Sequence, residues 1–157
     1  MIIQHLKNKF FSFLEGHDRK RIIMDRQCNE PLLTRYYLFL KDRKRFPFNV
    51  FLHKFHKGDP GDVHDHPWSY ATLILAGGYY EYTPNFENNK MIGETKHWRG
   101  PGHCRICSPS SYHRIELKPG VTPWTLFMPG PQRREWGFLV NNNWIHNDNY
   151  LDSRKHS

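Results

Sequence analysis

From about residue 19 to residue 140, short runs of β-branched and aromatic residues alternate with turns that contain glycine or proline. Helical periodicity is absent from this stretch, so the core must be built from strands that reverse direction every few residues. Such close spacing of strands and turns is typical of an all-β sandwich or barrel. The expected strands are residues 20–24, 32–40, 49–56, 68–75, 79–83, 91–98, 104–107, 111–117, 122–128 and 135–140.

The two ends of the chain follow other patterns. Apolar residues at positions 2, 3, 6, 10, 13 and 14 have the spacing of one helix face, and Gly16 is a suitable helix end. The last segment is polar, although Trp144 and Tyr150 are able to dock part of it. We therefore expect an N-terminal helix at residues 1–16, a single β-domain at 17–140 and a polar C-terminal tail at 141–157.

Charge suggests partners without selecting one. The 157 residues include 23 Lys+Arg and 15 Asp+Glu, which gives a net charge of +8 with neutral histidine. The basic residues fall in separate runs at 18–21, 41–45, 133–134 and 154–156, as is typical of solvated surface. Nucleic acid stays open as a partner but is not favoured, because a single basic stripe is not evident.

The sequence gives no sign of membrane insertion or export. No apolar run approaches the roughly 18 residues of a membrane span, and the N-terminus lacks the pattern of a secretory signal. The three cysteines Cys28, Cys104 and Cys107 form no disulfide framework. If 104–107 is a strand, Cys104 and Cys107 face opposite sides. We expect a cytoplasmic protein with no membrane partner.

Two histidines near the middle of the chain carry the chemistry. His64 and His66 are two residues apart, so on an extended chain both imidazoles project to the same face and can chelate one divalent ion. His113 lies in another strand-like run and is the candidate third ligand. A single His-x-His motif is also compatible with two histidines that are hydrogen-bonded at a strand end.

The spacing around this pair resembles the first motif of the cupin superfamily, a family of small jelly-roll β-barrels. That motif runs Gly, five residues, His-x-His, three or four residues, Glu, six residues, Gly. Gly58, His64, His66 and Gly77 fall in register with it, while Tyr70 stands at the position of the usual Glu.

The second cupin motif is matched in part. It runs Gly, five residues, Pro-x-Gly, two residues, His, three residues, Asn. Gly102 and His113 fit it, whereas Ser108, Ser110 and Leu117 replace its Pro, Gly and Asn. The resemblance implies an all-β, single cupin-type jelly-roll barrel after a short N-terminal helix. It also implies that the barrel holds a metal ion on three histidines, with Fe(II) favoured and Zn, Ni, Mn or Cu also suitable.

Three further residues are candidates for work beside the metal. If the strand from Trp68 keeps the face of the histidine pair, Tyr70 points inward as a proton donor or as a core aromatic. Glu81 on the next strand is a candidate fourth ligand or general base, or a salt-bridged structural residue. Arg105 is the candidate for binding an anionic substrate group.

Three functions are compatible with these residues. The favoured one is a non-haem metal oxygenase or dioxygenase that acts on a small polar substrate. The alternatives are a metal-free epimerase or isomerase of a sugar nucleotide, and a non-enzymatic cupin that binds a ligand or nucleic acid. The resemblance further implies a homodimer.

Overall fold

The computed structural model describes residues 2–25, 28–41, 46–59 and 61–154. Parts of two predicted basic runs, residues 42–45 and 155–156, lie outside the described residues. None of the helices within these ranges is long and apolar enough to cross a membrane.

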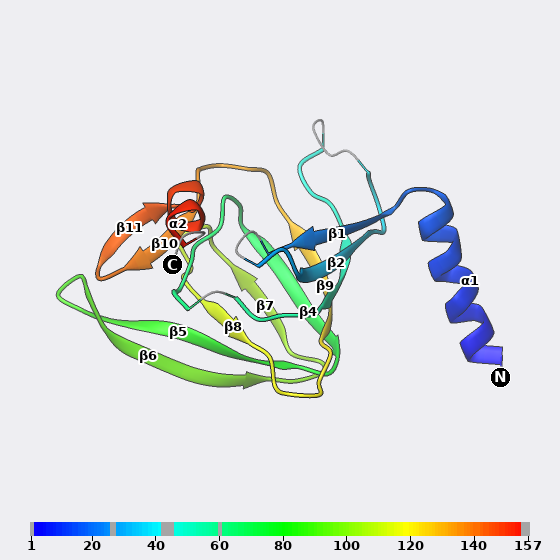
Figure 1. Cartoon of the computed structure of the whole chain (residues 1–157), viewed down its shortest axis with the longest axis horizontal. Coiled ribbons are helices and arrows are strands. Elements are labelled where there is room, and N and C mark those ends of the chain that lie inside the picture. The colour runs from blue at the N-terminus through cyan, green and yellow to red at the C-terminus, as the bar shows by residue number, and fades with distance from the viewer. Residues whose placement is uncertain (1, 26–27, 42–45, 60, 155–157) are drawn as a thin grey trace.

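The described chain is mainly β-structure between an N-terminal and a C-terminal helix (Figure 1). Each of the expected strands has a counterpart, and two have the expected bounds. The elements are α1 (Ile2–Gly16), β1 (Lys20–Met24), β2 (Pro31–Tyr37), β3 (Phe51–Phe55), β4 (Tyr70–Ala76), β5 (Tyr79–Glu87), β6 (Lys90–Arg99), β7 (Cys104–Cys107), β8 (Arg114–Glu116), β9 (Trp124–Pro129), β10 (Gly137–Val140), β11 (Asn143–His146) and α2 (Asn147–Ser153).

Hydrogen bonding divides the described strands into three groups. A six-stranded sheet has the order β1-β2-β3-β9-β4-β7, a three-stranded sheet has the order β6-β5-β8, and β10 pairs with β11. Figure 1 shows α1 at one end of the molecule and the β10, β11 and α2 unit near the other. The mostly-β fold with an N-terminal helix is as predicted. No strand ladder among the described residues closes the sheets into a barrel, so barrel closure stays unconfirmed.

The core lies on both faces of the large sheet. Between the two sheets, Ile74 of β4 packs with Tyr79 of β5 and Ile115 of β8. On the outer face, Leu14 of α1 packs with Tyr36 and Leu52. Alternation along each strand sends successive side chains to these two faces, which is why residues two apart share one environment.

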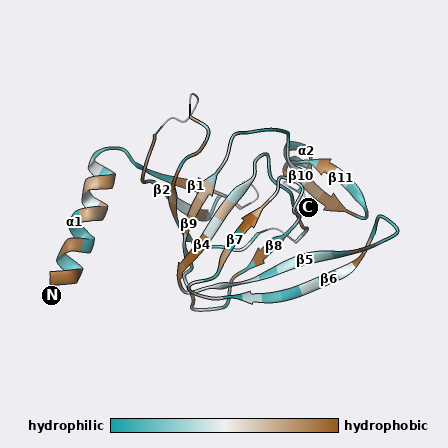
Figure 2. Cartoon of the chain, turned by 180° about the vertical axis from the view of Figure 1, so that it is seen from behind, coloured by the Kyte–Doolittle hydropathy of each residue, from teal (hydrophilic) through white to brown (hydrophobic). Residues whose placement is uncertain are grey.

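Helix α1 is docked only in part. The N-terminal end of its apolar stripe is uncovered, since Ile2 is 75% and Ile3 is 83% exposed. Figure 2 shows hydrophobic residues along α1 where it extends from the body. The helix therefore contributes one end of its apolar stripe to the core.

Tight turns with left-handed residues set the strand pairing. Gly77 and Gly78 join β4 to β5 with φ of 72° and 128°. A Cβ on Gly78 would lie 2.6 Å from the backbone oxygen of Arg99, so only glycine fits there.

The polar C-terminal segment contains structure that its composition did not predict. Asn141 and Asn142 have φ of 48° and 65°, as a two-residue type I′ hairpin turn requires, and they join β10 to β11. In α2, the Tyr150 ring stacks on Phe138 at 3.8 Å between centroids, and its hydroxyl donates to Asp62 at 2.6 Å. Residues 141–154 therefore pack onto the β-domain.

Candidate metal centre

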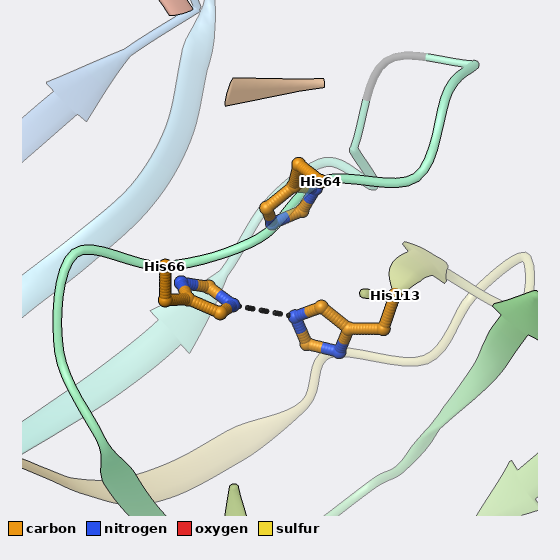
Figure 3. Close-up of side chains that lie close together, drawn as sticks. All are labelled: His64, His66 and His113. Atoms are coloured by element: carbon orange, nitrogen blue, oxygen red, sulfur yellow. Dashed lines mark hydrogen bonds between the residues drawn. The ribbon is translucent and has the colours of Figure 1, made fainter. Parts of the chain in front are cut away.

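The three histidines singled out in the sequence converge in space (Figure 3). His64 and His66 lie on the extended segment before β4, and His113 directly precedes β8. Each offers a nitrogen atom within 4.8 Å of the other two, and the Nε2 atoms of His66 and His113 are 2.9 Å apart. The fold thus brings together ligands that are far apart in the chain.

Backbone hydrogen bonds fix this convergence. His64 N–H donates to the His113 carbonyl at 2.9 Å, and His113 N–H donates back to the His64 carbonyl at 3.0 Å. On the other side, Asp65 N–H donates to the Gly137 carbonyl at 3.0 Å. The histidine segment is therefore held between the edge of the small sheet and the C-terminal hairpin.

The side chain of Asp65 strengthens the second of these attachments. It is fully buried and accepts hydrogen bonds from the Gly137 N–H at 2.7 Å and the Trp144 Nε1–H at 3.1 Å. Arg134 adds an ion pair at 2.8 Å. Because Asp65 alternates with His64 and His66, it faces away from them and has a structural part.

Glu81 determines which ring nitrogen of His113 faces the cluster. Its Oε1 lies 2.8 Å from His113 Nδ1, while its Oε2 pairs with Arg99 at 2.8 Å and with Arg105. Burial opposes the ionisation of Glu81, but the His113 hydrogen bond and the arginine charges outweigh it and lower its pKa to about 2. An ionised Glu81 accepts the Nδ1–H of His113, so Nε2 is the ring nitrogen that faces His66.

Burial keeps the imidazoles of His64 and His66 neutral near pH 7. Burial lowers the pKa of His64 to about 4, although the nearby Asp59 charge acts to raise it. Burial first, and then the neighbouring His113 and His64, hold the pKa of His66 well below its usual value. The Nδ1 atom of His64 is buried and has no hydrogen-bond partner among the residues that the structure describes. A buried ring nitrogen without a partner calls for a ligand.

Tyr70 lies beside the cluster, on the inward face predicted for it. Its ring centroid is 4.6 Å from that of His66, and its hydroxyl is 3.5 Å from His113 Nε2. Burial is the main cause that raises the pKa of Tyr70 well above its usual value, so the hydroxyl keeps its proton. Cys107 is the direct cross-strand partner of Tyr70.

The guanidinium of Arg105, predicted to bind substrate, is engaged by a carboxylate of the protein. It faces inward with Cys107, as predicted, but forms an ion pair with Glu81. Cys104 and Ile106 are exposed on the other face, and Cys107 is buried, so the predicted opposite orientation of the two cysteines is confirmed.

A cavity of about 360 Å³ opens beside the histidines. Its walls are mostly apolar and include Phe55, Phe127 and Tyr79 from the sheets. Trp136 and Phe138 come from the C-terminal part and contact His64, with ring centroids 5.9 and 5.5 Å away.

Arg35 and His53 also line this cavity, on β2 and β3. Of the two histidines on this part of the chain, His53 faces the cavity. His56 pairs with Thr34 on the other side of the sheet. Arg35 lies in a strand pattern without any motif, so only the strand alternation carried a signal for it.

The residues present fit a divalent metal ion. For metal–nitrogen bonds of about 2.1 Å, two neighbouring ligands of an octahedral ion are about 3.0 Å apart. The spacing of His66 and His113 is close to that value. Three imidazole nitrogens are a donor set that such an ion takes, and the Glu81 carboxylate behind His113 orients one of the rings.

Comparison with solved structures identifies the fold. The chain is similar to the polyketide cyclase RemF from Streptomyces resistomycificus (16% identity, 77% of this chain and 79% of that chain, TM-score 0.55). It is similar to a cupin 2 conserved barrel domain protein from Rhodopseudomonas palustris (15% identity, 77% and 78%, TM-score 0.54). It is also similar to Fe(II)-HppE crystallised with an alternative substrate, (S)-1-HPP (11% identity, 71% and 56%, TM-score 0.52).

These likenesses define the chain as a protein of cupin fold with a three-histidine cluster. The identities are low, so the likeness is one of fold, and the chain matches just over half of the HppE chain. No protein-family model matches the sequence, and no curated protein does.

Proposed function

We propose that this protein is a metal-dependent cupin enzyme whose ligands are His64, His66 and His113, and that it is a non-haem Fe(II) oxygenase. The observation that carries the proposal is the convergence of three imidazoles, one of them oriented by Glu81. The likeness to Fe(II)-HppE supports iron among the metals that such ligands accept. The likeness to a polyketide cyclase shows that the fold alone does not select this chemistry.

A divalent ion on three neutral imidazoles keeps its charge and open positions, and so supplies Lewis-acid chemistry or, as Fe(II), reaction with O₂. The surrounding residues prepare the site for it. Glu81 holds the Nδ1 proton of His113, and Arg99 and Arg105 stabilise the carboxylate. Both oxygens of Glu81 are thus engaged, so we assign it a positioning role rather than that of a ligand or base.

Tyr70 is the proton donor in this proposal. Its hydroxyl is protonated at neutral pH and lies near His113 Nε2, within reach of a substrate bound beside the histidines. Trp136 and Phe138 cover His64 and limit the access of water.

Metal stoichiometry tests the centre. Untagged protein, reconstituted with Fe(II) without oxygen and measured by elemental analysis, should hold about one equivalent per chain. The His64→Ala/His113→Ala variant should hold none. His56→Gln is the matched control, because His56 lies on the other side of the sheet, and it should bind as the wild type does.

The results separate the alternatives. Absence of metal from the wild-type protein would overturn the proposal and favour the metal-free isomerase or a binding role. For oxygen chemistry, the Fe(II)-loaded protein should react with nitric oxide, a surrogate for O₂, and give the EPR spectrum of a high-spin iron–nitrosyl adduct. If the Fe(II)-loaded protein does not react with nitric oxide, the proposed metal site stands and the proposed oxygenase activity is overturned.

A further inference from the structure

The cavity has a second polar region, on strands away from the histidines. Arg35 of β2 and His53 of β3 are direct cross-strand partners, and Arg35 Nε–H donates to His53 Nε2 at 3.0 Å. The Arg35 guanidinium also lies over the Phe51 ring, 4.4 Å from its centroid. A hydrogen bond and a cation–π contact together hold the guanidinium in one orientation.

His53 serves as the support of Arg35. It is 4% exposed, and its ring packs against those of Phe51 and Phe127, with centroid distances of 5.8 and 5.1 Å. Because arginine only donates, His53 Nε2 is the acceptor and the ring is neutral with its proton on Nδ1. Of this pair, Arg35 is therefore the member that carries the positive charge.

Neighbouring charges favour an anion here. Arg21 is the direct cross-strand partner of Arg35 in the β1–β2 pair, and it is exposed at the sheet edge. Like charges directly opposite one another repel, and an anion beside them relieves that repulsion. Asp25 and Asp59 also line the cavity, where Asp25 accepts from Lys57 Nζ at 2.7 Å and Asp59 accepts from the Ile115 N–H at 2.6 Å.

A continuous row of rings joins this region to the histidines. The row runs from His53 to Phe127 at 5.1 Å, from Phe127 to Tyr70 at 5.1 Å, and from Tyr70 to His66 at 4.6 Å between centroids. The walls between the two polar regions are apolar and largely aromatic. A ligand that contacts both polar regions therefore needs an apolar body that is no longer than this row of rings.

We propose that Arg35, supported by His53, binds the carboxylate of a compact substrate whose apolar or aromatic body extends along the ring row toward the three histidines. This inference deepens the proposed function by naming its substrate class: a small aromatic or branched aliphatic carboxylate. A cavity of about 360 Å³ is at the small end of ligand sites, which restricts the body to about one ring and a short chain. Arg105 is then part of the Glu81 network rather than the substrate anchor.

Binding of matched probes to metal-free protein tests this assignment separately from the metal centre. The probes are 3-phenylpropanoate, 3-phenylpropanamide and 3-phenylpropylamine, which share one body and differ in the end group. Calorimetry on EDTA-treated protein should show the carboxylate bound about ten- to a hundredfold more tightly than the amide, as a charge-assisted pair provides. The amine should bind least.

Variants locate the preference. Arg35→Gln should remove it, and Arg35→Lys, which keeps the charge but not the fork, should retain part of it. Lys54→Gln is the control, because Lys54 is next to His53 on the same strand but lies over Trp124 on the outer face. That variant loses the same charge and should keep the full preference. Circular dichroism and melting temperature check that each variant is folded.

The outcomes are distinct from those of the metal test. If the wild-type protein binds carboxylate and amide equally, or binds neither, the inference is overturned whatever the metal content. The same holds if Arg35→Gln keeps the preference. If the preference depends on Arg35 but no metal binds, the carboxylate site stands and the oxygenase proposal alone falls.

Discussion

Glu81 is the residue on which the polar network behind the histidines depends. It accepts from His113 on one oxygen and pairs with two arginines on the other. The sequence placed Glu81 on the strand after the histidine pair but could not give its partners. Arg99 and His113 are brought to it by the pairing of β5 with β6 and β8, because Glu81 lies directly opposite His97 and Ile115, whereas Arg105 comes from β7 of the other sheet.

Glu81→Gln should weaken metal binding by about ten- to a hundredfold, since the amide keeps the shape but loses the charge that orients His113. Competition with a chromophoric chelator measures the dissociation constant. Glu116→Gln is the control, because Glu116 pairs with Lys96 at the surface and does not contact the histidines. Unchanged affinity in Glu81→Gln would show that His113 needs no such support.

At the scale of elements, the sequence predicted the strands of the β-domain better than it predicted the elements of the polar C-terminal segment. β1 and β7 have the predicted bounds because turn residues border short β-rich runs on both sides. β11 and α2 were missed because their residues are mostly polar and dock through few side chains, chiefly Tyr150. The Asn141–Asn142 pair was the available signal for that hairpin.

Site prediction shows the same division. The three histidines were found because a motif spacing marks them, and the structure brings them together. The Glu81–Arg105 ion pair and the Arg35–His53 pair were not found. The Arg35–His53 pair depends on the register of two neighbouring strands, and the Glu81–Arg105 pair depends on how the two sheets pack together. No local pattern encodes either.

The β4–β5 turn offers a test of the fold. Gly78→Ala should lower the free energy of unfolding by about 2 kcal/mol or more, because the backbone is left-handed and the new Cβ meets Arg99 and Trp98. Gly93→Ala in β6 meets open space and should change stability by less than about 0.5 kcal/mol. Urea titration compares them, and equal effects would contradict the role given to the turn.

The attachment of the C-terminal hairpin offers another test. Asp65→Ala removes the acceptor for Gly137, Trp144 and Arg134 and should cost about 2–3 kcal/mol, because the buried Gly137 N–H is left without an acceptor. Trp144→Phe removes one hydrogen bond and should cost about 1 kcal/mol. Chemical unfolding measures both. A small loss in Asp65→Ala would mean that the hairpin is held mainly by Tyr150.

For the whole molecule, buried neutral histidines make stability depend on pH. The pKa of His53 is held well below its usual value, first by burial and then by the Arg35 charge, and the pKa values of His64 and His66 are lowered too. The unfolded chain therefore binds protons that the folded chain does not. Stability is fully present above pH 6.5 and falls as the pH drops below it.

At pH 5.5, each such histidine should cost up to about 1.4 kcal/mol relative to pH 7.5. Urea unfolding of EDTA-treated protein at the two pH values measures the loss. His53→Gln keeps an acceptor for Arg35 but cannot titrate, so this variant should lose about 1.4 kcal/mol less than the wild type. An identical loss in both proteins would place His53 outside this effect.

A bound ion should stabilise the whole chain by mass action. At a free Fe(II) concentration of about a hundred times the dissociation constant, the gain is about 2.7 kcal/mol. The melting temperature should then rise by about 5–10 °C in a protein of this size. Anaerobic thermal scans of the wild type and of His64→Ala/His113→Ala make the comparison. An equal rise in both would assign the effect to nonspecific binding.

His66 and His113 are 47 residues apart in the chain, yet their rings touch. In polymer terms, a bond between them is a cross-link that encloses strands β4 to β7 in a single loop. Closing a loop of that size restricts the unfolded chain by about 4 kcal/mol on the scale used for disulfides. An ion that stays bound to both histidines would therefore act as a removable cross-link. Its removal by a chelator would return that entropy to the chain.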